Sequence, residues 1–213
     1  VNAYIHGVMA DELTKLGNEL RDGGYRRPLM LVHNTGGMKK VSRTRAVLTH
    51  NAGPVAGLHG ALTLGREYGH ENIIFTDMGG TSFDIGVISG GRLRTYDFIP
   101  VIDRWRTNIP AIEVKSIGAG GGSIAWVDEL MGNADLVLGY LNPENYLGGE
   151  MLLDEDLSAE AIKNKIADPL GIDVVEAARR IRAIVDARMG QEVFNEVALK
   201  GHDPRDFALF ACG

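Results

Sequence analysis

The sequence predicts an α/β fold, because short apolar runs typical of buried strands alternate along the chain with longer helical patterns. Two observations support this prediction. The run Ile73–Phe75 and residues 83–89 flank a glycine-containing bend, as two paired strands would. Farther along, apolar side chains recur at helical spacing from residue 174 to residue 197, which is typical of a long helix with one packed face.

The N-terminal third of the chain predicts two helices with short strands between them. Apolar residues recur at helical spacing over residues 2–21, which predicts the first helix. Residues 28–32 form a short apolar run typical of a buried strand, and residues 41–49 predict another strand. The turn at residues 51–54 then leads into a mainly apolar helix over residues 55–68.

The middle of the chain predicts several strands in succession. Residues 73–77 and 83–89 form a strand pair, and residues 92–98 would extend it into a meander. Two prolines bracket residues 100–110, where a regular helix is not expected. Residues 113–117 alternate between apolar and polar side chains, which is typical of a half-buried strand.

The C-terminal part is predicted to be mainly helical. Residues 158–167 predict a helix capped by Ser158. Asp173 and Glu176 have the spacing of a capping box, which predicts the start of a helix about 27 residues long. Residues 207–211 predict a final strand.

Composition sets broad limits on function. The chain has 213 residues, 45% of them apolar, and this length allows one large domain or two lobes. The net charge of −6 argues against nucleic acid as a partner, because such binding needs a basic surface. No stretch approaches the roughly 20 apolar residues of a membrane span, and no charged-then-apolar leader opens the chain. With Cys212 as its only cysteine, the chain is expected to be cytoplasmic, with no membrane partner.

The bend between the two central strands carries the strongest functional signal. It runs Asp-Met-Gly-Gly-Thr-Ser-Phe-Asp over residues 77–84. Glycines let backbone N–H groups approach a ligand closely, hydroxyls donate hydrogen bonds, and carboxylates provide oxygens suited to Mg²⁺. A plain structural turn would explain the glycines alone, but the combination favours phosphate or Mg²⁺. The candidate phosphate-binding residues are Gly79, Gly80, Thr81 and Ser82, and the candidate metal ligands are Asp77 and Asp84.

The two aspartates of this bend have different expected roles. Asp77 is the candidate catalytic residue, through a water-mediated contact to Mg²⁺ or by orienting the attacking group. Asp84 either binds Mg²⁺ or holds the bend together through hydrogen bonds.

A second glycine-rich segment covers residues 118–123, Gly-Ala-Gly-Gly-Gly-Ser. It is either a flexible linker or an anion-binding loop at the start of a helix near Ser123. In the second case Gly120, Gly121 and Gly122 would contact phosphate.

The remaining polar candidates have ordinary structural explanations. The histidines at positions 33, 50 and 59 fit no zinc spacing, so packing or loop roles are favoured, with His33 and His50 the better candidates near a substrate. The basic run of Lys39, Lys40, Arg43 and Arg45 is expected to be a solvated loop rather than a phosphate or partner contact. Cys212 is expected to be a small buried residue.

Four segments, taken in order, resemble the A-type, ATP-using subunit of the hydantoinase/oxoprolinase family. They are residues 51–57 (Asn-Ala-Gly-Pro-Val-Ala-Gly), 77–84, 118–125 (Gly-Ala-Gly-Gly-Gly-Ser-Ile-Ala) and 133–149. The resemblance covers roughly residues 28–150. Within the family, the sequence is more similar to the acetone and acetophenone carboxylase branch than to hydantoinases. This similarity lies in residues 34–38, 51–57 and 77–84.

The resemblance implies an actin-like, sugar-kinase-like ATPase fold built from ribonuclease-H-like lobes. Residues 1–150 would form the central part of the A-type domain, with the phosphate hairpin at 73–90 and the glycine loop at 118–123. Residues 151–213 would form a helical segment that leads into a truncated adenine-side motif.

The function that the resemblance implies is phosphorylation by ATP, with Mg²⁺, of a carbonyl, enol or cyclic amide oxygen of a small molecule. The expected partner is a B-type subunit within an oligomer. The alternative is a non-catalytic, actin-like nucleotide-binding or assembly module that uses the same hairpin.

The sequence departs from the family pattern in three ways. It has one Asp-x-Gly-Gly-Thr hairpin where family members have two, it runs directly from Gly132 into Asn133 where they have an additional loop and strand, and it stops within residues 208–213, which resemble the start of the adenine-side motif. These departures indicate a fragment of the full fold.

Overall fold

The computed structural model describes residues 2–102, 104–119 and 131–213. The chain forms two compact units, and each is built from several stretches of sequence. The first unit contains Val1–Phe75, Gly86–Lys115 and Arg205–Phe210. The second contains Thr76–Ile85, Ser116–Pro204 and Ala211–Gly213.

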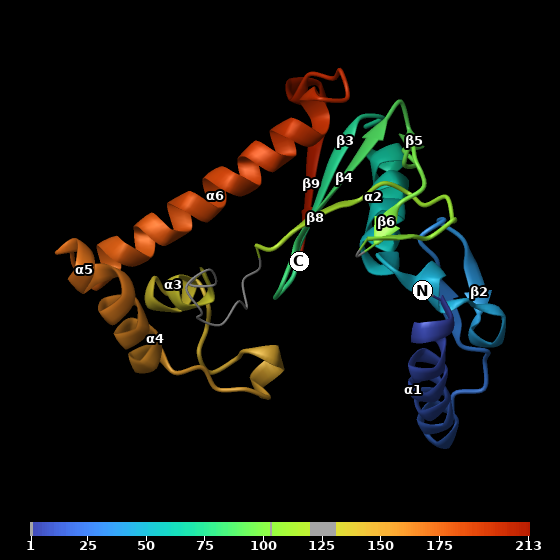
Figure 1. The fold of residues 1–213 in the computed structure, drawn as a ribbon, viewed down its shortest axis with the longest axis horizontal. Coiled ribbons are helices and arrows are strands. Elements are labelled where there is room, and N and C mark those ends of the chain that lie inside the picture. Colours follow the sequence, from blue (N-terminus) through green and yellow to red (C-terminus); the bar gives the residue numbers. More distant parts are fainter. Residues whose placement is uncertain (1, 103, 120–130) are drawn as a thin grey trace. The chain divides into compact units, whose positions relative to one another are not determined.

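A five-stranded sheet has the order β5-β4-β3-β9, with β8 also paired to β4 (Figure 1). Its strands are β3 (Ile73–Met78), β4 (Phe83–Ser89), β5 (Arg92–Leu93), β8 (Lys115–Ile117) and β9 (Ala208–Cys212). Strands β3 and β4 each begin in one unit and end in the other. The predicted α/β class and the central strand pair are therefore confirmed.

The first unit also holds two helices and two small hairpins. The helices are α1 (Asn2–Asp22) and α2 (Ala52–Tyr68), the strand pairs are β1 (Met30–Val32) with β2 (Met38–Lys40) and β6 (Val101–Ile102) with β7 (Trp105–Arg106), and 3-10 turns cover Val41–Arg43 and Ala46–Thr49. Its core lies between α2 and the sheet, where Leu58 packs with Phe75 and Ile88, each fully buried. Gly57 permits this close packing, because a Cβ atom there would lie 2.5 Å from the Phe75 ring.

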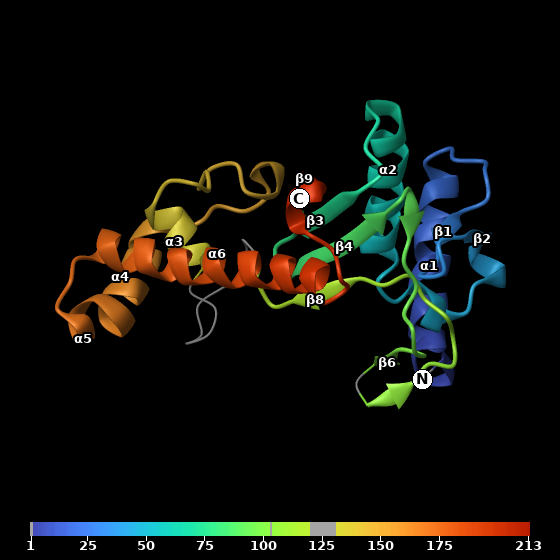
Figure 2. The ribbon, with the colours of Figure 1, turned by 90° about the horizontal axis from the view of Figure 1, so that it is seen from above.

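The second unit is mainly helical. Its helices are α3 (Met131–Val137), α4 (Glu155–Ile162), α5 (Asp168–Leu170) and α6 (Val174–Ala198), with a π-helical stretch over Lys163–Ala167 and a 3-10 turn at Leu147–Gly149. A further 3-10 turn, Pro204–Asp206, begins at the last residue of this stretch and continues into the first unit. Figures 1 and 2 show α3 and α4 beside the end of α6 that follows α5. There the guanidinium of Arg182 pairs with the buried carboxylate of Asp135 and lies 4.2 Å from the ring centre of Tyr140.

The apolar stripe predicted along the long helix faces two hydrophobic clusters. Ala178 and Ile181 pack with α3 and α4, whereas Val185, Met189 and Val193 pack beneath β4 and β8. The capping box is also confirmed, because the Asp173 carboxylate accepts a hydrogen bond from the backbone N–H of Glu176 at 2.9 Å. This helix therefore supports the start of β4.

The prediction of a strand at residues 41–49 is wrong, because two 3-10 turns occupy this segment. Local hydrogen bonds replace strand pairing there. The N–H groups of Thr44 and Leu48 donate to carbonyls three residues earlier, at 3.0 and 2.9 Å. The Thr44 hydroxyl also donates to the carbonyl of Lys40, which fixes the bend through a side chain.

Two further predictions need correction. The strand expected at 92–98 ends at Leu93, because the chain then pairs with a different segment through the bridge between Thr95 and Ile112. The helix expected to begin at Ser158 begins one turn earlier, with Asp154 as its cap; the Ser158 hydroxyl instead donates to Asn133 at 3.3 Å.

No helix in the described part of the chain combines the length and apolar character needed to cross a membrane.

Candidate functional site

The bend between β3 and β4 is a tight four-residue connection. Strand β3 ends at Met78, β4 begins at Phe83, and the N–H of Gly79 donates to the carbonyl of Ser82 at 3.0 Å. The first four residues of β3 and the first six of β4 are buried. Residues 79–81 are exposed. The buried parts of β3 and β4 therefore hold the exposed backbone of residues 79–81 in place.

Asp77 lies at the end of β3 and is half-buried. Among the residues that the structure describes, no hydrogen bond or ion pair engages its carboxylate. A carboxylate near a surface loop, without a protein partner, is free to bind a cation or a ligand hydroxyl. This placement is consistent with the role predicted for Asp77.

Asp84 is 7% exposed and is held by two hydroxyl groups. The Ser82 hydroxyl donates to its Oδ2 atom at 3.2 Å, and the Ser116 hydroxyl donates to its Oδ1 atom. The first bond stays within the β4 end of the bend and the second ties that end to β8, which matches the hydrogen-bonding alternative for Asp84. Sequence reasoning missed Ser116, because it lies 32 residues from Asp84 and nothing in the local pattern marks it.

The glycines of the bend serve a different purpose from the one expected for a strained turn. Neither Gly79 nor Gly80 has a positive φ, so residues other than glycine can adopt the same backbone conformation at these positions. A Cβ atom on Gly79 would meet only the Ser82 carbonyl oxygen, at 4.0 Å. What glycine provides here is therefore an unobstructed backbone. Thr81 is exposed beside it, whereas the proton of the Ser82 hydroxyl is engaged by Asp84.

The base of the bend is packed on both sides. Phe83 and Ile85 are buried against Ala119 and against Met189 of α6. Gly213 lies so close to the backbone of Met78 that a Cβ atom there would come within 2.2 Å of the Met78 carbonyl oxygen. This close packing holds in place the strand ends that carry Asp77 and the glycine loop.

The second glycine loop falls outside the described residues, and so do Gly120, Gly121 and Gly122 and the helix start expected near Ser123. The described part of this segment ends at Ala119, which is buried in the cluster beneath β4.

His33 and the basic run have structural roles of the kind expected. His33 is buried, its Nε2 atom lies 3.0 Å from the Thr44 hydroxyl, and burial together with the Lys39 charge lowers its pKa. The four basic residues at 39, 40, 43 and 45 are exposed, as expected for a solvated loop. Within the described residues, no group of three or more histidine, cysteine or acidic side chains is placed to hold a metal ion.

Cys212 is exposed, so the expectation of burial was wrong. It lies in β9, the last strand in the sheet order, where one edge has no strand partner in the described structure.

Known proteins match this chain along its whole length. The family model described as hydantoinase/oxoprolinase matches residues 1–132 and 130–213. The acetophenone carboxylase gamma subunit of Aromatoleum aromaticum is 39% identical over 241 aligned residues, covering 100% of this chain and 33% of that protein. The caprolactamase subunit alpha of Pseudomonas jessenii is 34% identical, covering 100% of this chain and 35% of that protein.

Two solved structures are similar in fold as well as in sequence. The nucleotide-free structure of acetone carboxylase matches with a TM-score of 0.83 at 30% identity, over 93% of this chain and 32% of that one. The ATP-dependent caprolactamase of Pseudomonas jessenii matches with a TM-score of 0.75 at 33% identity, over 100% and 35%. These matches confirm the predicted actin-like ATPase type of fold. The chain spans about one third of the length of these relatives.

Proposed function

The chain belongs to the hydantoinase/oxoprolinase family, and from this premise we propose that the protein uses ATP to activate a carbonyl, enol or cyclic amide oxygen of a small molecule. The single observation that supports this proposal is the bend at residues 77–84, where a carboxylate without a partner among the described residues adjoins an exposed glycine backbone.

The residues of the bend suit the terminal phosphates of ATP. Gly79 has no side chain to block an approaching oxyanion, and a Cβ atom there would have open space around it. Thr81 is exposed and offers a hydroxyl donor. Mg²⁺ in nucleotide sites is usually held by one or two carboxylates together with phosphate oxygens and water, and Asp77 has the carboxylate for this role.

Each residue has a separate proposed role. Asp77 holds Mg²⁺ through water or orients the attacking oxygen, and the N–H of Gly80 and the hydroxyl of Thr81 position phosphate oxygens. Gly79, whose own N–H is paired with Ser82, leaves their approach open. Asp84 keeps the bend in shape through its hydroxyl partners and remains the second candidate metal ligand. Gly120, Gly121 and Gly122 remain candidates for a further phosphate contact. When bound, ATP supplies a phosphoryl group that makes a poor leaving group or electrophile reactive.

The partner and the cellular location belong to the same proposal. Relatives carry subunit names, alpha, beta and gamma, which supports assembly with a B-type subunit in an oligomer. Helix α1 has no buried residue, and Tyr4 and Val8 are 89% and 71% exposed, so this helix has apolar surface that another chain or segment could cover. A reducing cytoplasm suits the lone cysteine.

Substrate-stimulated ATP hydrolysis tests the proposal. Full-length protein purified with its partner subunit is expected to hydrolyse ATP faster when a ketone with bicarbonate, a hydantoin or a lactam is added singly. Phosphate release would be measured for each substrate. Hydrolysis that stays the same with every substrate would instead favour the non-catalytic nucleotide-binding module.

A further inference from the structure

An open groove of about 380 Å³ lies in the first unit, between α1 and the chain around the β1–β2 hairpin. One wall is a face of α1 that extends from residue 6 to residue 21, and the other is formed by residues 28–29 and 40–42. Leu13 on the helix, with Leu29 and Val41 opposite, is half-buried and gives the groove an apolar floor. We call this feature the α1 groove.

Hydrogen bonds outside the groove hold both of its walls. The side chain of Asn2 accepts a hydrogen bond from the N–H of Val47 at 3.1 Å, which fixes the first turn of α1. The N–H of Val41 donates to the carbonyl of Leu29 at 3.1 Å, which closes the base of the hairpin. The shape of the groove therefore does not depend on contacts across it.

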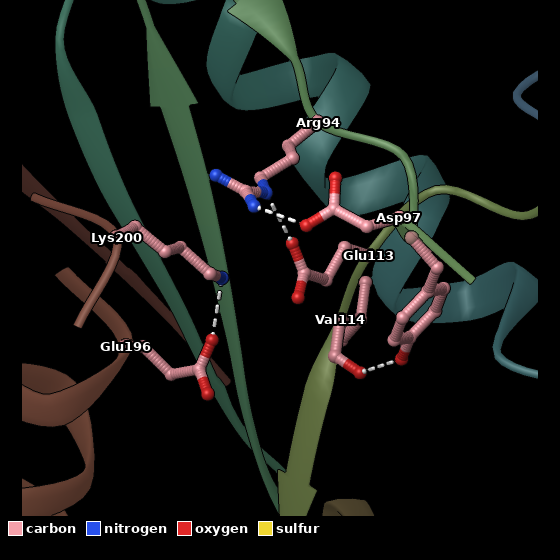
Figure 3. A network of polar contacts seen from close by, with 7 residues as sticks. Arg94, Asp97, Glu113, Val114, Glu196 and Lys200 are labelled. Carbon is pink, nitrogen blue, oxygen red and sulfur yellow. Dashed lines mark hydrogen bonds and ion pairs between the residues drawn. The ribbon is translucent and has the colours of Figure 1, made fainter.

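The rim of the α1 groove carries positive charge that the fold does not balance. Residues 20–46 contain seven lysine and arginine residues and one acidic residue. Elsewhere in the same unit such charge is paired, and Figure 3 shows Arg94 directed at Asp97 and Glu113, with ion-pair distances of 2.7 and 2.9 Å. Among the described residues, no ion pair engages the basic side chains of residues 39–45. A basic rim beside an apolar floor favours a partner segment that is both acidic and apolar.

The second unit contains a segment with this chemistry. From residue 116 to residue 162 the sequence has nine acidic residues and no lysine, arginine or histidine. Residues 150–157, which we call the acidic segment, hold four of the nine together with four apolar residues. Leu152 and Leu157 are 76% and 63% exposed. Glu155 and Asp156 are also exposed, and no ion pair engages them in the part of the chain that the structure describes.

We propose that the α1 groove of one copy of the protein binds the acidic segment of a second copy. The basic rim meets the carboxylates of the segment, and the exposed leucines cover the apolar floor. The lengths match as well, because the α1 face extends about 22 Å and the eight residues that lead into α4 span about 20 Å. Since each surface repels its own kind, the contact joins two different surfaces of the two copies.

Self-association of the full-length protein, measured by analytical ultracentrifugation without a partner subunit, tests the proposal. We expect association that depends on protein concentration and weakens at least about tenfold when the salt concentration rises from about 50 mM to about 500 mM, because salt screens the rim charges. Protein that stays monomeric at every concentration, or association that salt does not affect, would overturn the proposal.

Charge reversal locates the contact. Lys40→Glu with Arg43→Glu changes the groove, and Glu155→Lys with Asp156→Lys changes the acidic segment; no ion pair or side-chain hydrogen bond engages these four groups among the described residues. Each double variant alone should associate at least about tenfold more weakly than the wild type. An equimolar mixture of the two should recover the wild-type association, because each groove then faces a segment of opposite charge. Association that persists in either double variant, or a mixture as weak as its components, would contradict the proposed contact.

Leu152→Ser tests the apolar part of the contact and should weaken association about fivefold or more. Its matched control is Leu199→Ser, which replaces a leucine of the same unit that is 85% exposed and lies outside the acidic segment. The control should associate as the wild type does, and equal effects of the two variants would remove Leu152 from the contact.

The proposed contact is independent of nucleotide binding, since neither surface includes residues 77–84. The Asp77→Asn variant is therefore expected to lose ATP turnover and to self-associate as the wild type does. Weaker association in this variant would contradict the independence of the two sites. Normal turnover with intact association would count against the proposed role of Asp77 alone.

Discussion

The Asp77→Asn variant is expected to lose about 10²-fold or more of the substrate-stimulated ATP turnover while the fold remains intact. Its carboxylate is half-buried at the end of β3 and has no partner among the described residues, so no structural contact is lost. Asparagine keeps the size of the side chain but removes the charge that Mg²⁺ or an attacking hydroxyl requires. Steady-state phosphate release, with the melting temperature as a check on folding, gives the measurement.

Asp168→Asn is the matched control for this variant. Asp168 belongs to the same unit, is 55% exposed, and pairs with Lys163 at the surface at 2.7 Å. An exposed ion pair of this kind contributes little to stability, so the control should retain wild-type turnover. If both variants had the same activity, Asp77 would have no role in the reaction.

The Gly79→Val variant is expected to weaken binding of the ATP–Mg²⁺ complex at least about tenfold without unfolding the protein. Gly79 does not have a positive φ, and a side chain there meets only the Ser82 carbonyl oxygen, at 4.0 Å. The added side chain therefore costs the fold little, but it occupies the space through which a phosphate oxygen reaches the backbone N–H groups. Calorimetric titration with a non-hydrolysable ATP analogue would measure the loss.

Gly37→Val provides the comparison, because Gly37 also lies in a hairpin turn, has no positive φ and has open space at its Cβ position. It belongs to the β1–β2 turn and lies outside the proposed phosphate site. Its nucleotide affinity should equal that of the wild type. An unchanged affinity in Gly79→Val as well would show that phosphate does not approach the backbone at this position.

The sequence predicted those parts of the fold that are determined by neighbouring residues. Two apolar runs around Gly79 and Gly80 predicted the central hairpin, since both the strands and the turn are specified within 17 residues. The Asp173 and Glu176 pair predicted the start of α6 for the same reason, because a cap depends on residues three positions apart.

The parts that could not be predicted depend on residues distant in sequence. Residues 41–49 look like a strand by composition, yet the buried contact between Thr44 and His33, which lies 11 residues earlier, accompanies turns in this segment instead. The hydrogen bond between Ser116 and Asp84 joins residues 32 positions apart, and no local pattern marks it.

The most direct test of the central claim is a structure of the full-length protein, with its partner subunit, bound to a non-hydrolysable ATP analogue and Mg²⁺. The claim predicts the terminal phosphates against the backbone of Gly79 and Gly80, with Asp77 within reach of the metal directly or through one water. Nucleotide bound elsewhere, with this bend empty, would contradict it.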